Sequence, residues 1–208
     1  LTQVLVDKND PAYEHPTKPV GPFYTKSEAD RIANERGITF VEDSGKGYRR
    51  VVPSPKPTAI IERTAIDLLV KNNILTIALG GGGIPVVRDE DGHLRGVAAV
   101  IDKDLTASLI ASQINADYLV FLTGVEKVAS NFGKSNQKDF DSITVDEAKK
   151  YMQDGYFPPG SMGPKVEAAL SFVENGGRKS IITKIDKLRE ALLGRAGTSV
   201  IIRGGQNI

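Results

Sequence analysis

The sequence predicts a layered α/β protein, and two observations carry that prediction. Apolar, strand-like runs alternate with helical patterns through most of the 208 residues, as expected for a sheet covered by helices. The segment from Pro11 to Pro57 departs from this alternation and holds most of the chain's 11 prolines. Because proline fixes the backbone where a chain enters and leaves an excursion, we predict a protruding subdomain over residues 11–57 rather than an independent domain.

The first third of the chain contains clear local signals. The run at residues 4–6 predicts a short strand. A helix is expected over residues 25–36, because Thr25 and Glu28 have the spacing of a capping box and Gly37 follows. The runs ITFVE and YRRVV then flank the turn DSGKG and predict a hairpin.

An amphipathic helix is predicted next, in the run IIERTAIDLLVKN. Its expected apolar face consists of Ile61, Ala65, Leu68 and Leu69. The helix leads into the strand-like run ILTIAL and four glycines. The run VVRDEDGHLRGVAAV carries an Asp-Gly turn between two strand-like arms.

The second half of the chain continues the alternation of helix and strand. LTASLIASQI predicts a helix and ADYLVFL a buried strand. TVDEAKKYMQDG predicts a helix with a second capping box, from Thr144 to Glu147. PKVEAALSFVENGG predicts a helix closed by Gly176, and SIIT, KIDKLREALL and TSVII complete the pattern as strand, short helix and strand.

Composition excludes several kinds of site. The chain has no cysteine, which removes disulfides, thiolate metal sites and cysteine nucleophiles, and the two histidines, His15 and His93, argue against a histidine metal cluster. The net charge of +1 gives no case for binding nucleic acid or an anionic membrane. No apolar run approaches the roughly 20 residues of a membrane span and no signal-peptide pattern opens the chain, so we expect a cytoplasmic protein.

The four glycines Gly80–Gly83 raise the question of phosphate binding. A P-loop requires Lys and then Ser or Thr after its last glycine, but Ile84 and Pro85 follow here, and the G-x-G-x-x-G pattern also fails. The run nevertheless stands at the carboxyl end of an expected strand, where open α/β sheets bind ligands. Four glycines also lose much backbone entropy on ordering. A tight turn and a ligand-binding backbone are therefore equally supported by this run alone.

Lys165 is placed unusually for a surface lysine. Ser161 is a plausible N-cap and Pro164 suits a first turn, so Lys165 falls in the first turn of the expected helix. A cation there opposes the helix dipole, at a cost of a few tenths to about 1 kcal/mol. A phosphate at the same N-terminus would reverse that sign, because it would meet free N–H groups and the ammonium together. A solvated surface lysine is the alternative.

Two further lysines stand at constrained positions. Lys103 lies between Asp102 and Asp104, at a junction where an expected strand meets an expected helix. Helix capping explains one of these two carboxylates but not the lysine between them. Lys18 lies between two prolines, which present it in a defined direction, although exposed lysines beside proline are common.

Several motifs together resemble the carbamate kinases of the amino acid kinase family, in order and from about the first residue to about residue 202. They are ALGGGGIPVV, GVAAVIDKDLTASLIA, NADYLVFLTGV, GYFPPGSMGPKVEAALSFVENGG and PTKPVGPFY with GYRRVVPSPKP. The proline-rich segment separates the carbamate kinases from acetylglutamate kinase, uridylate kinase and aspartokinase. The resemblance implies an open, mainly parallel αβα sandwich and a homodimer. It also implies reversible phosphoryl transfer between ATP and carbamate, giving ADP and carbamoyl phosphate, with Mg²⁺ and with ATP synthesis in arginine fermentation.

The resemblance also implies roles for individual residues. Lys103 and Lys165 match the family's phosphate-binding lysines, and Asp104 matches the aspartate that orients them. Lys18 matches the lysine that the protruding subdomain places over the transferring phosphoryl group, and Gly80–Gly83 match the loop at the centre of the site. The residues that match the nucleotide site are Thr123, Gly124, Val125, Phe132, Gly160, Ser161 and Met162, with Lys165. Such a set suits phosphoryl transfer, which needs positioning and charge neutralisation rather than a nucleophile.

Two family motifs, ALGGNA and GNGPQVG, lie upstream of the first residue here, so residues 1–208 match the C-terminal portion of an amino acid kinase domain. If these residues are the entire molecule, we expect it to be inactive, and if they belong to a longer protein, we expect that protein to be active. The alternatives are another amino acid kinase, or a non-catalytic nucleotide-binding remnant. Retention of Lys18, Lys103, Asp104 and Lys165 together argues against a remnant.

Overall fold

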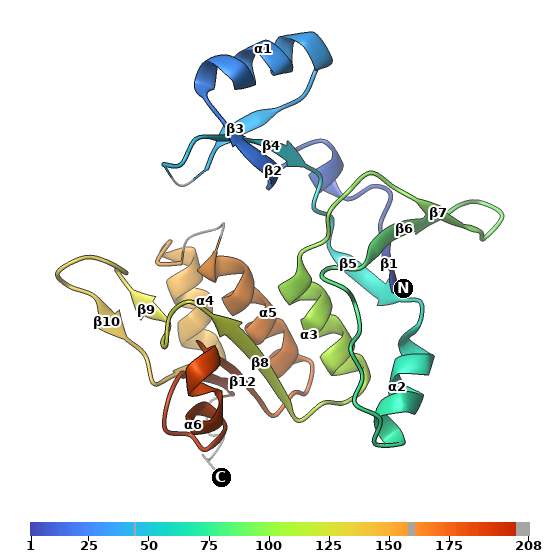
Figure 1. Ribbon diagram of the computed structural model, residues 1–208. Coiled ribbons are helices and arrows are strands. Elements are labelled where there is room, and N and C mark those ends of the chain that lie inside the picture. The colour runs from blue at the N-terminus through green and yellow to red at the C-terminus, as the bar shows by residue number, and fades with distance from the viewer. Residues whose placement is uncertain (44, 158–160, 203–208) are drawn as a thin grey trace. The chain divides into compact units, whose positions relative to one another are not determined.

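The computed structural model describes residues 1–43, 45–157 and 161–202 of the chain (Figure 1). The chain divides into two compact units. Unit 1 contains Leu1–Glu62 with Thr76–Asp102, and unit 2 contains Arg63–Leu75 with Lys103–Ile208. Helices and strands occur in both units, so the predicted α/β class is confirmed.

Unit 1 contains a four-stranded sheet with the strand order β5-β1-β6-β7. Strand β1 pairs antiparallel with β5 and parallel with β6, and β6 pairs antiparallel with β7. This confirms the strand expected at residues 4–6 and the hairpin around the Asp-Gly turn. The strands are Gln3–Val6 (β1), Pro57–Ile60 (β5), Ile84–Arg88 (β6) and Leu94–Gly96 (β7).

The proline-rich segment of unit 1 forms an antiparallel sheet of its own, in the order β2-β4-β3. Helix α1 (Lys26–Arg36) contacts β3 and β4 of this sheet. The helix begins with the expected capping box at Thr25 and ends at Gly37, whose φ is 64°. The boundaries of a subdomain at residues 11–57 remain a prediction. The other elements are a 3₁₀ turn at Pro11–Tyr13 and the strands Lys18–Tyr24 (β2), Phe40–Glu42 (β3) and Tyr48–Val52 (β4).

Unit 2 contains an open four-stranded sheet with the order β11-β13-β12-β8. Strand β8 pairs parallel with β12, and β13 pairs parallel with β11, while β12 and β13 are antiparallel. Between β8 and β11 in the chain, β9 and β10 form a separate short antiparallel pair. The strands are Tyr118–Thr123 (β8), Ala129–Ser130 (β9), Lys138–Asp139 (β10), Ser142–Thr144 (β11), Lys179–Lys184 (β12) and Thr198–Ile201 (β13).

Helix α5 (Met162–Glu174) is the centre of the core of unit 2. It contacts α3 and α4 and also packs on β8, β12 and β13. Ala168 and Ala169 are fully buried, and their small side chains allow the neighbouring elements to approach, while Phe172 fills the space beside them. The other helices of this unit are Arg63–Lys71 (α2), Lys103–Gln113 (α3), Val145–Gln153 (α4) and Leu188–Leu192 (α6), with a 3₁₀ turn at Ile185–Lys187.

Two apolar runs that we expected to be strands are irregular. Residues 74–79 form no ladder with any described segment, and Leu75 and Ile77 are 96% and 97% exposed. Residues 98–101, expected as a strand before Asp102, are also irregular. A strand needs a neighbour for its backbone groups, and an apolar run by itself cannot specify one.

Two burial expectations are also wrong. Helix α2 forms as predicted, but it buries Ile66, whereas Leu68 and Leu69 of the expected apolar face are exposed. Strand β8 forms as predicted, but it lies at the edge of the described sheet and exposes Tyr118 and Leu122. Apolar content indicates which side chains favour burial, and the packing of each unit decides which of them are covered.

The capping box of α4 provides a direct stability test. Thr144 Oγ1 accepts from the Glu147 backbone N–H at 3.3 Å, and Glu147 Oε2 accepts from the Thr144 N–H at 2.9 Å. Thr144→Ala removes the first bond and is expected to lower the free energy of unfolding by about 1 kcal/mol in urea denaturation. Thr64→Ala, at an exposed position in α2, is the control. Equal losses in both variants would contradict the capping role.

Candidate active site

Asp104 joins the two lysines that the sequence places at helix starts. Lys165 Nζ donates to Asp104 Oδ2 at 3.0 Å, and Lys103 Nζ donates to the same oxygen at 3.4 Å. Asp104 lies in the first turn of α3, and α3 packs against α5, which carries Lys165. The fold thus brings Lys165 to Asp104, although the two residues are 61 positions apart in the chain.

The three side chains differ in their contact with solvent. The exposed fractions are 8% for Asp104, 14% for Lys165 and 62% for Lys103. A solvated surface lysine is therefore the wrong description of Lys165. A largely buried ammonium beside a buried carboxylate is held in one direction, whereas Lys103 retains freedom to follow a ligand.

The N-terminus of α5 favours an anion. Ser161 occupies the N-cap position as expected, but its side chain makes no capping hydrogen bond, because its backbone (φ −138°, ψ −76°) is outside the extended geometry of a capping residue. The first turn of α5 contains no acidic residue. The positive end of the helix dipole and the Lys165 ammonium therefore lie at the same helix terminus.

Lys18 lies in unit 1, at the start of β2, and forms an ion pair with Asp102 of the same unit. The side chain of Lys18 is 31% exposed and that of Asp102 is 10% exposed. The proline-flanked lysine thus has a fixed carboxylate partner within its own unit. Its role over a transferring phosphoryl group stays a prediction.

The backbone of unit 1 accounts for all four glycines. Gly80, Gly81 and Gly83 have φ values of 56°, 115° and 83°, which L side chains rarely adopt. A Cβ at Gly82 would lie 2.1 Å from the Ile101 carbonyl oxygen, and a Cβ at Gly83 would lie 2.3 Å from Val4 Cγ2. A tight, closely packed turn therefore requires this run, and contact with a ligand stays a prediction.

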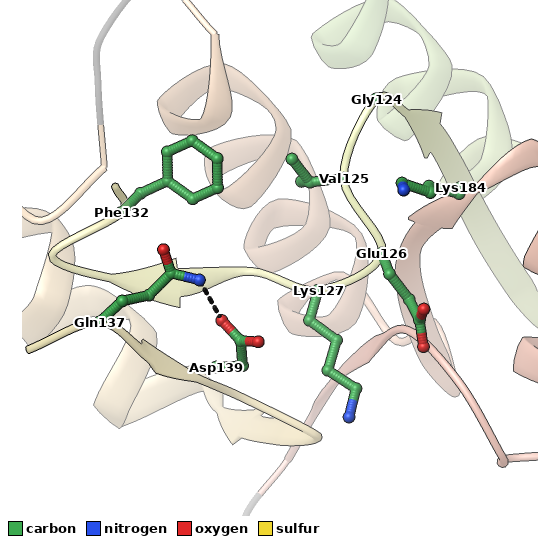
Figure 2. Close-up of a pocket in the computed structure, with 8 residues that line it drawn as sticks. All are labelled: Gly124, Val125, Glu126, Lys127, Phe132, Gln137, Asp139 and Lys184. Atoms are coloured by element: carbon green, nitrogen blue, oxygen red, sulfur yellow. Dashed lines mark hydrogen bonds between the residues drawn. The ribbon is translucent and has the colours of Figure 1, made fainter. Parts of the chain in front are cut away.

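A cavity of about 330 Å³ opens where the expected nucleotide residues Gly124, Val125 and Phe132 lie (Figure 2). Thr123 ends strand β8 immediately before it. Phe132 is 58% exposed, and an exposed aromatic ring is a surface on which a base can stack. Five further lining residues were not predicted from the sequence: Glu126, Lys127, Gln137, Asp139 and Lys184.

Of the remaining residues expected at the nucleotide site, Ser161 and Met162 are not among the described residues that line this cavity. Ser161 is exposed, and Met162 is partly buried against the core of unit 2. Gly160 lies outside the described residues. Of the unpredicted lining residues, Lys184 carries a signal that the sequence did show, because it directly follows the strand-like run SIIT.

Asp89, Asp91 and His93 form a small cluster in the turn between β6 and β7, with potential metal-ligand atoms within 4.8 Å of one another. Asp89 already accepts from Arg95 Nε at 2.9 Å and from the His93 N–H at 2.7 Å. The Arg95 bond lowers the pKa of Asp89 below its usual value. Asp91 and His93 are exposed, so the cluster is explained as a hydrogen-bonded hairpin turn.

The fold and this site define an α/β protein with an anion-favouring helix start and a cavity at the carboxyl ends of parallel strands. Residues 16–184 match the amino acid kinase family, and the chain belongs to that family. Among the described residues, no helix combines the length and apolar character needed to cross a membrane.

Several proteins that resemble this chain in sequence and structure are carbamate kinases. The chain is 50% identical over 201 residues to carbamate kinase of Thermococcus kodakarensis, covering 97% of this chain and 64% of the relative. It is 51% identical to carbamate kinase 3 of Staphylococcus aureus, covering 96% and 65%. A structure of carbamate kinase from Giardia lamblia bound to AMP-PNP has a TM-score of 0.84 at 46% identity, covering 97% and 64%. The chain thus spans about 64% of the length of these proteins.

Proposed function

We propose that the protein to which this chain belongs transfers a phosphoryl group reversibly between ATP and carbamate, giving ADP and carbamoyl phosphate. The observation that carries the proposal is the ion-paired cluster of Lys103, Asp104 and Lys165. It occurs in a chain about 50% identical to carbamate kinases. Within this proposal ATP, ADP, carbamate and carbamoyl phosphate are the substrates.

The cluster suits the chemistry of phosphoryl transfer. Such a transfer needs the reacting oxygens in line and the charge on the phosphoryl oxygens neutralised. Lys165 supplies a positioned ammonium beside the N–H groups of the α5 N-terminus, and Lys103 supplies a more mobile one. Asp104 holds Lys165 in place at 3.0 Å, since an oriented ion pair limits the directions in which the lysine can point, and it contacts the exposed Lys103 at a longer 3.4 Å.

Lys18 and the glycines Gly80–Gly83 belong to the proposal as the groups on unit 1. Lys18 would contact the transferring phosphoryl group, and the backbone N–H groups of Gly80 and Gly81 would approach the small substrate. Both of these glycines are exposed, and no Cβ shields their backbones. The nucleotide base would stack on Phe132 beside Thr123, Gly124 and Val125, with residues 160–162 completing its site.

Mg²⁺ is also part of the proposal, as a companion of the nucleotide. The carboxylate nearest the two lysines is Asp104, and its Oδ2 already accepts from both of them. The described cluster therefore fits an ion held mainly by phosphate oxygens rather than by a protein cage. Such an ion would neutralise phosphate charge. The proposal further places the protein in the cytoplasm as a homodimer that makes ATP in arginine fermentation.

The test is ATP formation by the whole protein from carbamoyl phosphate and MgADP, followed with a coupled ATP readout. We expect ATP to accumulate in proportion to enzyme. ADP binding without ATP formation at high enzyme concentration would favour the non-catalytic alternative and reject the proposal. ATP formed from another acyl phosphate but not from carbamoyl phosphate would instead indicate a different amino acid kinase.

A further inference from the structure

We propose that Lys184 binds the phosphate groups of the nucleotide, as an additional cation that this chain places in the cavity of Figure 2. The inference rests on the proposed function, because it presumes that a nucleotide occupies this cavity. It extends the lysine set beyond Lys103 and Lys165.

The position of Lys184 is the first argument. Strands β8 and β12 are parallel, and their register pairs Lys184 with Thr123 at the carboxyl ends of both strands. Ligands of open α/β sheets bind beyond this edge. Lys184 lines the cavity together with Gly124 and Val125, and Figure 2 shows its amino end directed toward Val125.

The charges around the cavity are the second argument. Lys127 also lines it, but its ammonium is paired with Asp141 at 2.5 Å, and Figure 2 shows it pointing away from Phe132. Glu126 and Asp139 are the acidic lining groups. Within the described parts of the chain, no carboxylate lies within ion-pair distance of Lys184. It is therefore the lining cation whose charge is available to a ligand.

The side chains that line the cavity indicate which chemical groups a ligand must carry. An ammonium donates hydrogen bonds and accepts none, so Lys184 requires an acceptor. An anionic oxygen is the strongest such partner, since charge-assisted bonds are about twice as strong as neutral ones. The exposed ring of Phe132 suits a base. Beside it, Gln137 Nε2 donates to Asp139 Oδ1 at 2.7 Å, a polar pair suited to the base edge.

Gly124 leaves room for a ligand between these groups. A Cβ at this position would meet no atom within 4 Å, so neither packing nor strain requires glycine there. The space where a Cβ would stand is unfilled, and Gly124 lines the cavity. A nucleotide with its base on Phe132 can pass over Gly124 and Val125 and present its phosphates to Lys184.

The experiment compares ADP with adenosine, which has the same base and sugar but no phosphate. Isothermal titration of the whole protein is carried out with both compounds, for the unaltered protein and for Lys184→Gln. We expect Lys184→Gln to weaken ADP binding about tenfold and to leave adenosine binding unchanged, in line with the loss of one charge-assisted contact. Lys184→Arg retains the charge and should keep most of the ADP affinity.

Lys179→Gln is the matched control. Lys179 lies at the opposite end of the same strand, with its ammonium 5.7 Å from the centre of the Tyr118 ring, and its loss changes the net charge equally. We expect ADP affinity in this variant to equal that of the unaltered protein. A thermal midpoint measured for each variant confirms that the sheet is folded.

The outcomes separate this inference from the proposed function. Unchanged ADP affinity in Lys184→Gln overturns the inference, and so does an equal loss for adenosine, which would place Lys184 against the base or sugar. An unaltered protein that binds no ADP overturns both proposals. A protein that needs Lys184 for ADP but makes no ATP from carbamoyl phosphate supports the inference and rejects the proposed function.

Discussion

Lys165→Ala is expected to lower the turnover number for ATP formation by about two to three orders of magnitude, comparable to the loss of one preorganised group that stabilises transition-state charge. The physical reason is position. Lys165 is 14% exposed and held 3.0 Å from Asp104 Oδ2, at the N-terminus of α5. Lys103, the other cation at Asp104, is 62% exposed and is therefore not fixed at that point. Steady-state rates with carbamoyl phosphate and MgADP provide the measurement.

The fold of Lys165→Ala should survive, so that the loss can be assigned to chemistry. Asp104 keeps Lys103 as an ion-pair partner at 3.4 Å, and the buried carboxylate is not left alone. Lys150→Ala removes the same charge from an exposed position on α4 and serves as the control. Near-normal turnover in Lys165→Ala would remove this residue from the proposed site.

Gly82→Ala is expected to lower the free energy of unfolding by about 3 kcal/mol, the upper part of the range for forcing an extra methyl group into a packed site. The added Cβ would lie 2.1 Å from the Ile101 carbonyl oxygen and 2.7 Å from its carbon. Both are backbone atoms, which cannot turn aside as a flexible side chain can. Urea denaturation measures the change, with thermal melting as a second reading.

Gly96→Ala is the matched control for this change. Gly96 lies in β7 of the same unit, its φ is not in the left-handed region, and a Cβ there would meet nothing within 4 Å. We expect its stability to stay within about 0.5 kcal/mol of the unaltered protein. Similar losses in both variants would show that the approach of Gly82 to Ile101 does not determine the stability of the turn.

Local signals in the sequence were enough to predict the helices and the capped starts of α1 and α4, although the helix expected over KIDKLREALL forms as a 3₁₀ turn followed by α6. The capping boxes at Thr25 and Thr144 form as predicted, and Gly37 ends α1 in the left-handed conformation. These features depend on residues three or four apart, whose contacts exist wherever the helix exists. The same kind of signal marked Lys165, because a lysine in a first turn opposes the helix dipole unless an anion is bound nearby.

For the candidate site, too, local sequence predicted some features and tertiary packing decided the others. Sequence placed Lys103, Asp104 and Lys165 at the starts of two helices, and a family resemblance grouped them. Their shared contact on a single Asp104 oxygen depends on how α3 packs against α5, which no local pattern states. Lys184 was not predicted as a site residue, because two features that only the fold provides single it out. These are the parallel register of β12 with β8 and the pairing of Lys127 with Asp141.

The sequence by itself thus determined the α/β class, the capped starts of α1 and α4, and the candidate residues of the proposed site. Only the tertiary structure decided that residues 74–79 form no strand in the described chain, that Gly82 is required by the nearby Ile101 carbonyl, and that Lys165 is largely buried. The physical reason is the distance along the sequence over which each interaction acts. Capping and periodicity act between near neighbours, whereas strand pairing, close backbone approach and burial depend on segments that only folding brings together.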